Sequence, residues 1–401
     1  MSALFPFRAL RPMPQAAASV ASVPYDVVNT EEARALAVLD PLSFLRVTRA
    51  EADLPPETNP YSDRVYAQAV RNLEDLKRAA PMIIEDEPAL YFYRLRMGAH
   101  EQTGLAGCFS LDEYDRGLVK KHERTRRDKE DDRTRHMVEL RAQTGVVFLT
   151  YRASTAVDAV AAQVTSEPPL YDFVAPDKVG HTVWQVAGPA VPALVAAFAE
   201  LPALYIADGH HRAASAARAR EALPGSPEAA RFVAVAFPDA QTQILPYNRV
   251  VKDLAGASHD EFLEAVRGAV EMREGAPDPV RAGEVSMFLG GRWLGLTLPR
   301  PPAGTSRADA LDVEVLQRVV LGPLLKIGDI RTDKRIDFVG GARGTAELER
   351  LVTSGQAAVA FSMFPVTIHD LVAIADAGEI MPPKSTWFEP KLRDGLLTHL
   401  I

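Results

Sequence analysis

Residues 203–217, Ala-Leu-Tyr-Ile-Ala-Asp-Gly-His-His-Arg-Ala-Ala-Ser-Ala-Ala, join two segments of different character. Residues 203–207 form a short apolar run with an aromatic and a β-branched member, which predicts a buried strand. Residues 213–222 are rich in alanine and predict a helix. The turn between them runs from Asp208 to Arg212, and four of its five residues are polar or charged. Because a purely structural connection needs only a glycine and a cap, this turn predicts a binding site at the end of a strand in an α/β fold.

The start of the predicted helix is suited to phosphate. It exposes free backbone N–H groups and the positive end of the helix dipole. Gly209 lets a ligand approach the backbone, and Arg212 can make bidentate contacts to phosphate oxygens. Asp208 suits a magnesium ion or a substrate hydroxyl. In the structural alternative Asp208 caps the helix and the other side chains are solvated, but two adjacent histidines, His210 and His211, favour the functional interpretation.

Composition sets broad limits on the protein. A chain of 401 residues predicts two domains or one elaborated domain. The hydrophobic fraction of 47% and the charged fraction of 24% are typical of soluble globular proteins. A net charge of −8 argues against a general nucleic-acid binder. The single cysteine, Cys108, excludes an intramolecular disulfide and fits a reducing cytoplasm, and we expect neither a signal peptide nor a membrane span.

Apolar periodicity predicts a mixed α/β (α+β) protein. We expect a main domain over residues 1–255, a small α+β insertion or subdomain over 256–303, and a C-terminal α/β segment over 304–401 that packs back on the main domain. The proline-rich stretch 299–304 is the predicted linker. Tyr247, Asn248 and Arg249 are expected on a turn. Helices are predicted over 29–39, 62–79, 154–164, 189–200, 312–321, 344–354 and 367–377; strands over 41–48, 89–97, 104–111, 146–151, 179–186, 231–237, 335–339 and 357–361; and a helix with a Gly-Gly hairpin within 260–299.

Residues 120–136 carry a dense mixture of positive and negative charges. The structural interpretation is a solvated helix with ion pairs between successive turns. Residues 122–125, His-Glu-Arg-Thr, precede that helix and follow a strand-rich region. Their position would also let Glu123 act as a base and its neighbours as phosphate ligands in a cleft. The two interpretations have equal weight.

Two proline-punctuated segments offer further candidates. In the first, Arg8 and Asp26 are polar residues in apolar surroundings, and they either line a pocket or form surface salt bridges. In the second, Lys384, Ser385 and Thr386 stand together in the stretch Met-Pro-Pro-Lys-Ser-Thr. A lysine with two hydroxyls can hold a phosphate, and a plain surface turn is the equal alternative.

Five stretches resemble, in order, the successive signatures of the bacterial and archaeal domain-of-unknown-function 1015 family. The resemblance spans nearly the whole chain and implies membership of that family, whose function is not known. The five stretches are Phe7-Arg-Ala-Leu-Arg-Pro, Val23-Pro-Tyr-Asp-Val-Val, Lys121-His-Glu-Arg-Thr, Ile206-Ala-Asp-Gly-His-His-Arg and Met381-Pro-Pro-Lys-Ser-Thr.

The Asp-Gly-His-His-Arg turn is also similar to a phosphate-binding motif of the ParB/sulfiredoxin-like fold, which includes partition-protein nucleotide-binding domains, sulfiredoxin and free serine kinases. The resemblance implies a nucleotide-binding core elaborated with additional helix–strand units. It also implies that Gly209, His210, His211 and Arg212 hold nucleotide phosphates, and that Asp208 touches magnesium or the acceptor hydroxyl. A histidine stands where sulfiredoxin has its cysteine, which argues against sulfiredoxin chemistry. DNA partition is not expected, because the chain is acidic and has no helix-turn-helix segment.

The resemblance leads to a functional hypothesis: a phosphotransferase, like a free serine kinase, that acts on a small hydroxylated metabolite. The expected cofactors are ATP or ADP with Mg²⁺, and serine is the first substrate to test. Arg212, His211 and the helix start would stabilise the transferring phosphoryl group. Asp26 or Glu123 would accept the hydroxyl proton, and Lys384 would close over the phosphate.

Two alternatives remain open. One is a phosphatase for phosphoserine or a similar phosphomonoester, with His210 or His211 as the phosphoryl acceptor. The other is a regulatory protein that binds a nucleotide without chemistry. We expect a cytoplasmic location and no nucleic-acid or membrane partner, and homo-oligomeric assembly is left open.

Overall fold

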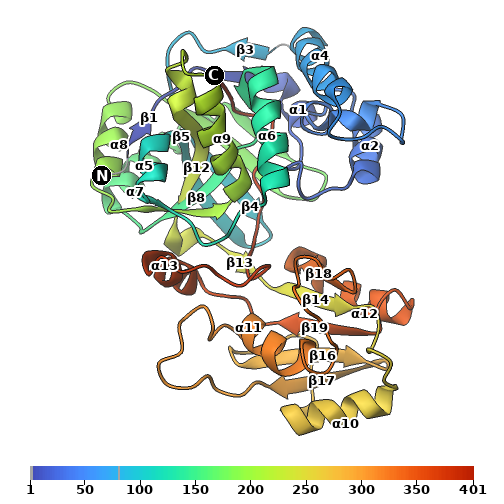
Figure 1. The fold of residues 1–401 in the computed structure, drawn as a ribbon. Helices are drawn as coiled ribbons and strands as arrows, with labels where there is room; N and C mark the ends of the chain where they lie inside the picture. The colour runs from blue at the N-terminus through green and yellow to red at the C-terminus, as the bar shows by residue number, and fades with distance from the viewer. Residues whose placement is uncertain (1–2, 80–81) are drawn as a thin grey trace. The chain divides into compact units, whose positions relative to one another are not determined.

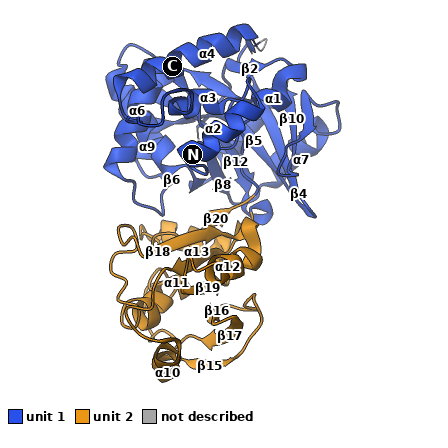
Figure 2. Ribbon diagram, turned by 90° about the vertical axis from the view of Figure 1, so that its right-hand side faces the viewer, with its two compact units in different colours: residues 1–242, 390–401 blue, residues 243–389 orange. Residues whose placement is uncertain are grey.

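The computed structural model describes residues 3–79 and 82–401, and the chain forms two compact units (Figure 2). The first unit contains residues 1–242 and 390–401, and the second contains residues 243–389. The stretch 256–303, expected as a subdomain, therefore lies inside the second unit together with most of residues 304–401. The end of the chain belongs to the first unit. Helices and sheets occur in both units, which confirms the mixed α/β class.

The first unit is built around a nine-stranded mixed sheet (Figure 1). The strand order is β6-β11-β8-β12-β5-β4-β10-β9, with β1 paired to β5. Strand β11 runs parallel to β6 and antiparallel to β8, while β8 and β12 are parallel. The strands are β1 (Leu4–Phe5), β4 (Leu90–Met97), β5 (His100–Ser110), β6 (Val119–Lys120), β8 (Val147–Tyr151), β9 (Tyr171–Val174), β10 (Gly180–Val186), β11 (Leu204–Asp208) and β12 (Arg231–Pro238).

Helices cover this sheet through small and apolar side chains. Ala213, Ala216 and Ala219 recur every third residue on α9 and are buried in the same core cluster as the sheet residues Leu149 and Phe232. Alanines at this spacing bring the helix backbone close to the sheet. The helices of this unit are α1 (Ala17–Val20), α2 (Thr30–Leu39), α3 (Leu45–Thr48), α4 (Asp63–Ala79), α5 (Leu111–Asp115), α6 (Arg127–Leu140), α7 (Thr155–Val164), α8 (Ala190–Ala199) and α9 (His210–Ala222).

Helices α6 and α9 lie side by side (Figure 1). Ser215 Oγ on α9 donates to the backbone oxygen of Glu130 on α6 at 3.2 Å. Arg218 on α9 pairs with both Glu130, at 3.3 Å, and Asp131, at 2.5 Å. Two of the acidic residues in the charged stretch 120–136, Glu130 and Asp131, therefore form ion pairs that join α6 to α9.

The first unit contains a second, four-stranded sheet, and the end of the chain forms one of its inner strands. Its order is β3-β2-β21-β7, where β2 is Ala9–Pro12, β3 is Met82–Ile84, β7 is Ala142–Gln143 and β21 is Thr398–Leu400. Before β21, the backbones of Ser22 and Asp394 exchange two hydrogen bonds, at 3.0 and 3.1 Å. The tail after residue 390 is therefore fixed beside the N-terminal loop that contains Tyr25 and Asp26.

The second unit is organised on a six-stranded antiparallel sheet of order β15-β17-β16-β19-β14-β18. A short pair, β13–β20, is separate from it. The strands are β13 (Ile244–Leu245), β14 (Tyr247–Val251), β15 (Glu271–Glu274), β16 (Glu284–Leu289), β17 (Arg292–Thr297), β18 (Ile336–Gly340), β19 (Val359–Met363) and β20 (Trp387–Phe388). The helices are α10 (His259–Ala269), α11 (Asp312–Leu316), which continues as a π-helical turn to Leu321, α12 (Gly344–Thr353) and α13 (Ile368–Asp376).

Two predicted elements are wrong. The strand over 41–48 is instead a turn followed by helix α3, whose apolar side chains are buried; a short apolar run cannot by itself distinguish a strand from a buried helix. Tyr247, Asn248 and Arg249 lie in the central strand β14 and not on a turn. Arg249 is buried there because carbonyl oxygens, including that of Lys384 at 2.9 Å, accept its N–H groups.

Candidate functional site

The turn between β11 and α9 is shorter than its sequence predicts. Strand β11 ends at Asp208, and the helix begins at His210, so that Gly209 alone makes the connection. Gly209 has φ 94° and ψ 29°, a left-handed conformation that glycine adopts without a steric penalty. The prediction of a five-residue turn is therefore wrong. His210, His211 and Arg212 form the first turn of the helix, where the N–H groups have no partner within the helix.

Arg212 points into the protein and is only 3% exposed. One of its guanidinium nitrogens donates to both carboxylate oxygens of Asp26, at 2.8 and 2.9 Å, and another donates to the carbonyl oxygen of Val146 at 2.8 Å. Burial lowers the pKa of Arg212, but the charges of Asp26 and Asp208 outweigh it and raise the pKa, so the guanidinium stays charged. Its hydrogen bonds orient the Asp26 carboxylate, whose side chain is 38% exposed.

The loop that carries Asp26 is held by a second arginine. The guanidinium carbon of Arg133, on α6, lies 4.3 Å from the centre of the Tyr25 ring, and that of Arg212, on α9, lies 5.6 Å from it. The backbone oxygen of Tyr25 also accepts a hydrogen bond from Arg49 at 3.2 Å. Cationic side chains of this kind are attracted to the electron-rich face of a tyrosine ring. Arg133 of α6 and Arg212 of α9 thus both help to position the Tyr25–Asp26 segment.

Asp208, the last residue of β11, forms an ion pair with the tail of the chain. Lys391 Nζ lies 3.1 Å from its Oδ2 atom. Burial raises the pKa of Asp208, but Lys391 and Arg212 outweigh this effect and hold the pKa well below its usual range. Asp208 is therefore ionised at neutral pH and compensated by two cations.

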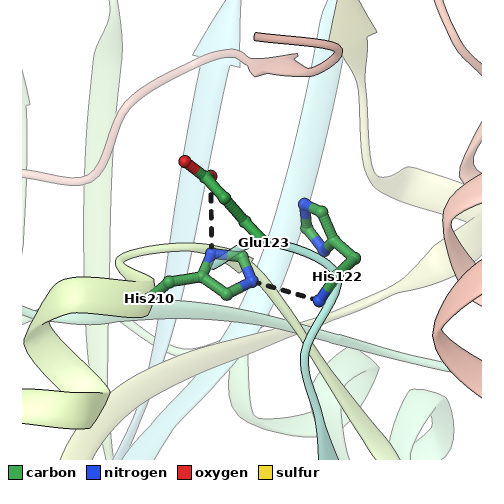
Figure 3. A group of neighbouring side chains, drawn as sticks. All are labelled: His122, Glu123 and His210. Carbon is green, nitrogen blue, oxygen red and sulfur yellow. Dashed lines mark hydrogen bonds and ion pairs between the residues drawn. The ribbon is translucent and has the colours of Figure 1, made fainter. Parts of the chain in front are cut away.

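Two histidines and a glutamate, His122, Glu123 and His210, lie close together (Figure 3). The rings of His122 and His210 are nearly perpendicular, with centres 4.5 Å apart. His210 Nδ1 lies 3.9 Å from a carboxylate oxygen of Glu123, and its Nε2 accepts a long hydrogen bond of 3.4 Å from the His122 backbone N–H. Burial lowers the pKa of His122 to about 4 and also lowers that of His210, so both rings are neutral at pH 7.

His211 turns toward helix α6. Its Nε2 atom accepts a hydrogen bond of 3.0 Å from the backbone N–H of Arg126, the residue that precedes the helix. Burial lowers the pKa of His211, which favours the neutral ring that this hydrogen bond requires. His211 therefore satisfies a backbone donor at the start of α6.

A further carboxyl group, Asp394, is 1% exposed and interacts electrostatically with Arg212. Burial raises the pKa of Asp394 to about 7, with Arg212 acting to lower it and Asp26 to raise it. The Val146 N–H donates to this carboxyl group, while the Val146 carbonyl accepts from Arg212. Arg212 thus interacts with an exposed carboxylate, that of Asp26, and with a buried carboxyl group, that of Asp394.

A family model described as "Protein of unknown function (DUF1015)" matches residues 4–316. The chain belongs to this family. The predicted membership is therefore confirmed. None of the curated proteins has a sequence that matches this DUF1015 chain.

Three solved structures were found to be similar to this DUF1015 protein. SbnI with a C-terminal truncation, from Staphylococcus aureus, is 13% identical with a TM-score of 0.41, over 74% of this chain and 87% of that one. A conserved hypothetical protein from Pyrococcus furiosus is 15% identical with a TM-score of 0.37, over 74% and 95% of the two chains. A free serine kinase in complex with AMP is 13% identical with a TM-score of 0.37, over 73% and 91%.

The fold of this DUF1015 protein brings together residues from four segments that are distant in the sequence. Asp26, Glu123 and the Asp208–Arg212 turn are in contact through the interactions described above. The tail adds Lys391 and Asp394, which the sequence analysis did not identify as site residues. The signal that could have found them is the polar run Glu-Pro-Lys-Leu-Arg-Asp-Gly, residues 389–395, in a stiff segment where no fold argument requires it.

The other candidates lie elsewhere. Arg8 Nε donates to the backbone oxygen of Glu85 at 2.7 Å. Lys384, Ser385 and Thr386 belong to the second unit, where Ser385 Oγ donates to the Pro382 carbonyl at 2.5 Å. The predicted role of these four residues in holding a phosphate stays a prediction. Among the described residues, no helix is long and apolar enough to cross a membrane.

Proposed function

We propose that this protein is a nucleotide-dependent phosphotransferase that phosphorylates a small hydroxylated metabolite, with free serine as the first acceptor to test. The observation that carries the proposal is the Asp26 carboxylate. It is exposed to solvent, fixed by two hydrogen bonds from Arg212, and placed at the first turn of helix α9. A phosphoryl transfer needs an oriented proton acceptor beside a site for the phosphate, and this arrangement supplies both.

In the proposed reaction, the phosphate lies at the start of α9. The free N–H groups of its first turn and the Lys391 ammonium group offer positive charge there. The acceptor hydroxyl oxygen forms a bond to the terminal phosphorus of the nucleotide, and the bond between that phosphorus and the leaving nucleotide oxygen breaks. The hydroxyl proton passes to Asp26, which returns it to water through its exposed side. Arg212 acts as a positioning residue for Asp26.

Magnesium does not fit Asp208 as its protein ligand. The Lys391 ammonium group lies 3.1 Å from this carboxylate and would repel a divalent cation. The proposal therefore includes Mg²⁺ only as the counter-ion that a nucleotide carries on its phosphates. The nucleotides to be tried first are ATP, ADP and AMP, since the similar free serine kinase structures are described as complexes with AMP and ADP.

The test is phosphorylation of serine by the purified full chain with ATP or ADP and Mg²⁺, followed by mass spectrometry of the acceptor. Asp26→Asn keeps the size of the side chain but removes the base, and we expect kcat to fall about 100-fold or more. Nucleotide binding, measured by thermal shift, should change little. Asp278→Asn, at an exposed aspartate of the second unit, is the control and should keep full activity.

Three results would contradict the proposal in different ways. Full activity of Asp26→Asn would remove Asp26 as the base. Release of phosphate from phosphoserine without any nucleotide would indicate a phosphatase. A nucleotide-induced thermal shift without turnover of serine or a panel of other hydroxylated metabolites would indicate a binding protein.

A further inference from the structure

The parallel pairing of β6 with β11 brings two histidines together. In this pair Leu204 lies opposite Val119, and Tyr205 lies opposite Lys120. Because parallel strands end at the same edge of a sheet, the residues that follow each strand leave it side by side. His122 lies two residues beyond β6 and His210 two residues beyond β11, so the pairing brings both histidines to the same end of the sheet, where their rings are in contact.

This cluster has the composition of a metal site. One ligand atom from each of His122, Glu123 and His210 can be chosen so that all three lie within 4.8 Å of one another. Two imidazoles and one carboxylate form a donor set that suits divalent transition metals such as Zn²⁺, whereas Mg²⁺ prefers oxygen ligands alone. Three protein ligands also leave coordination positions for water or a substrate oxygen.

The buried ring of His122 supports this interpretation independently. The side chain is 2% exposed. The Ile206 backbone makes a hydrogen-bonding contact with the ring, but neither ring nitrogen has a partner at normal hydrogen-bond geometry among the described residues. A buried polar atom without such a partner costs free energy, which a metal ligand bond would recover. Glu123, in contrast, is exposed and lies at the side from which an ion can arrive.

From this geometry we propose that His122, Glu123 and His210 bind one divalent transition-metal ion of the zinc class. The nitrogen of His210 that faces Glu123 is Nδ1. Ligation through Nδ1 moves the ring proton to Nε2 and gives up the hydrogen bond from the His122 N–H. That bond is 3.4 Å long and hence weak, so its loss opposes metal binding only slightly.

The test is a titration of the metal-free full chain with Zn²⁺ in the absence of nucleotide. We expect one equivalent to bind, and Glu123→Gln and His122→Gln each to weaken binding by about tenfold or more. His259→Gln removes an exposed histidine of helix α10 and should bind like the wild type. Co²⁺ in place of Zn²⁺ should give visible absorption bands that depend on nitrogen ligands and are lost in His122→Gln.

Two results would overturn the proposal: equal Zn²⁺ affinity of the wild type and both ligand variants, or Mg²⁺ binding at this site as tightly as Zn²⁺. If His122→Gln fails to fold, which circular dichroism will reveal, Glu123→Gln decides alone, since its side chain is exposed. The titration contains neither nucleotide nor serine, and the kinase assay uses metal-free protein supplied with Mg²⁺. Failure of the metal site and failure of the phosphotransferase proposal are therefore separate outcomes.

Discussion

Replacing Asp394 with asparagine is expected to change how the stability of the fold depends on pH. Burial raises the pKa of Asp394 from 3.8 to about 7, against the charge of Arg212 on α9 and Arg133 on α6 and with the help of Asp26. The folded chain therefore retains a proton that the unfolded chain releases above pH 4. Each pKa unit corresponds to about 1.4 kcal/mol. Over this window Asp394 alone lowers the unfolding free energy of the wild type by about 4 kcal/mol as pH rises from 4 to 7, and its contribution is constant above pH 7.

Asparagine is neutral throughout this range, so the variant lacks the dependence of unfolding free energy on pH that Asp394 contributes. Its carbonyl oxygen can still accept from the Val146 N–H, whereas its amide takes the place of Oδ2, an atom without a partner among the described residues. The free-energy cost of burying this amide does not depend on pH. The test therefore rests on how the unfolding free energy changes with pH and not on its value at one pH.

The measurement is denaturant unfolding of the wild type and Asp394→Asn at intervals from pH 4.5 to 8. We subtract the unfolding free energy of the wild type from that of Asp394→Asn at each pH. This difference should increase by about 3 to 4 kcal/mol between pH 4.5 and pH 7 and then stay constant. Asp278→Asn provides the control at an exposed aspartate. A difference that is constant across the range would show that Asp394 is ionised in the folded protein, and would refute the reasoning from burial.

Two further substitutions test the local structure. Gly209→Ala places a side chain in a left-handed conformation at φ 94° and should lower the unfolding free energy by about 1–2 kcal/mol, as measured by thermal denaturation. Gly268→Ala, in the last turn of α10 with nothing near the added Cβ, should raise it by up to about 0.5 kcal/mol, and equal effects at both sites would contradict the assigned turn. Burial lowers the pKa of His136 to about 4, and its ring nitrogen contacts the Val47 carbonyl at 3.0 Å. Because the unfolded chain takes up the proton first, His136 lowers the unfolding free energy by about 3 kcal/mol as pH falls from 6.5 to 4. His136→Asn should remove this contribution, so the difference between the wild-type and variant curves in the same unfolding assay should change by that amount.

Local features of the fold were accessible from the sequence because they depend on neighbouring residues. The helix predicted from Asn29 is present, and the Asn29 side chain and Glu32 form reciprocal caps at its start. The helix predicted at Thr367 has the same arrangement with Asp370. Strands β4 and β5 form the predicted hairpin and pair residues that are close in the sequence, from Met97 with His100 to Tyr91 with Ala106. In each case the determining interactions join neighbouring parts of the chain.

The errors have a different origin. Arg249 and Asn248 looked like turn residues because they are polar, but carbonyl and backbone groups elsewhere in the second unit satisfy them inside a sheet. Helix α9 begins three residues before its predicted start. His210, His211 and Arg212 are interpreted from the sequence as ligand-binding residues of a turn, but they form the first turn of the helix. A polar residue type indicates that the side chain needs a hydrogen-bonding partner. It does not indicate whether that partner is solvent, a ligand or another part of the protein.

The same limit explains what the sequence could predict of the candidate site. The Asp-Gly-His-His-Arg segment was identifiable because its unusual residues are adjacent. Lys391 and Asp394 could not be assigned to it, since their partners Asp208 and Ser22 are distant in the chain and the contact depends on the tail returning to the first unit. Because of their position, Arg212 interacts with carboxyl groups of the protein as well as being a candidate phosphate ligand. It carries the only guanidinium group among the described residues that donates to Asp26, and it interacts electrostatically with Asp394, a buried carboxyl group that keeps its proton below about pH 7, so the tail contributes to the electrostatic environment of the proposed base.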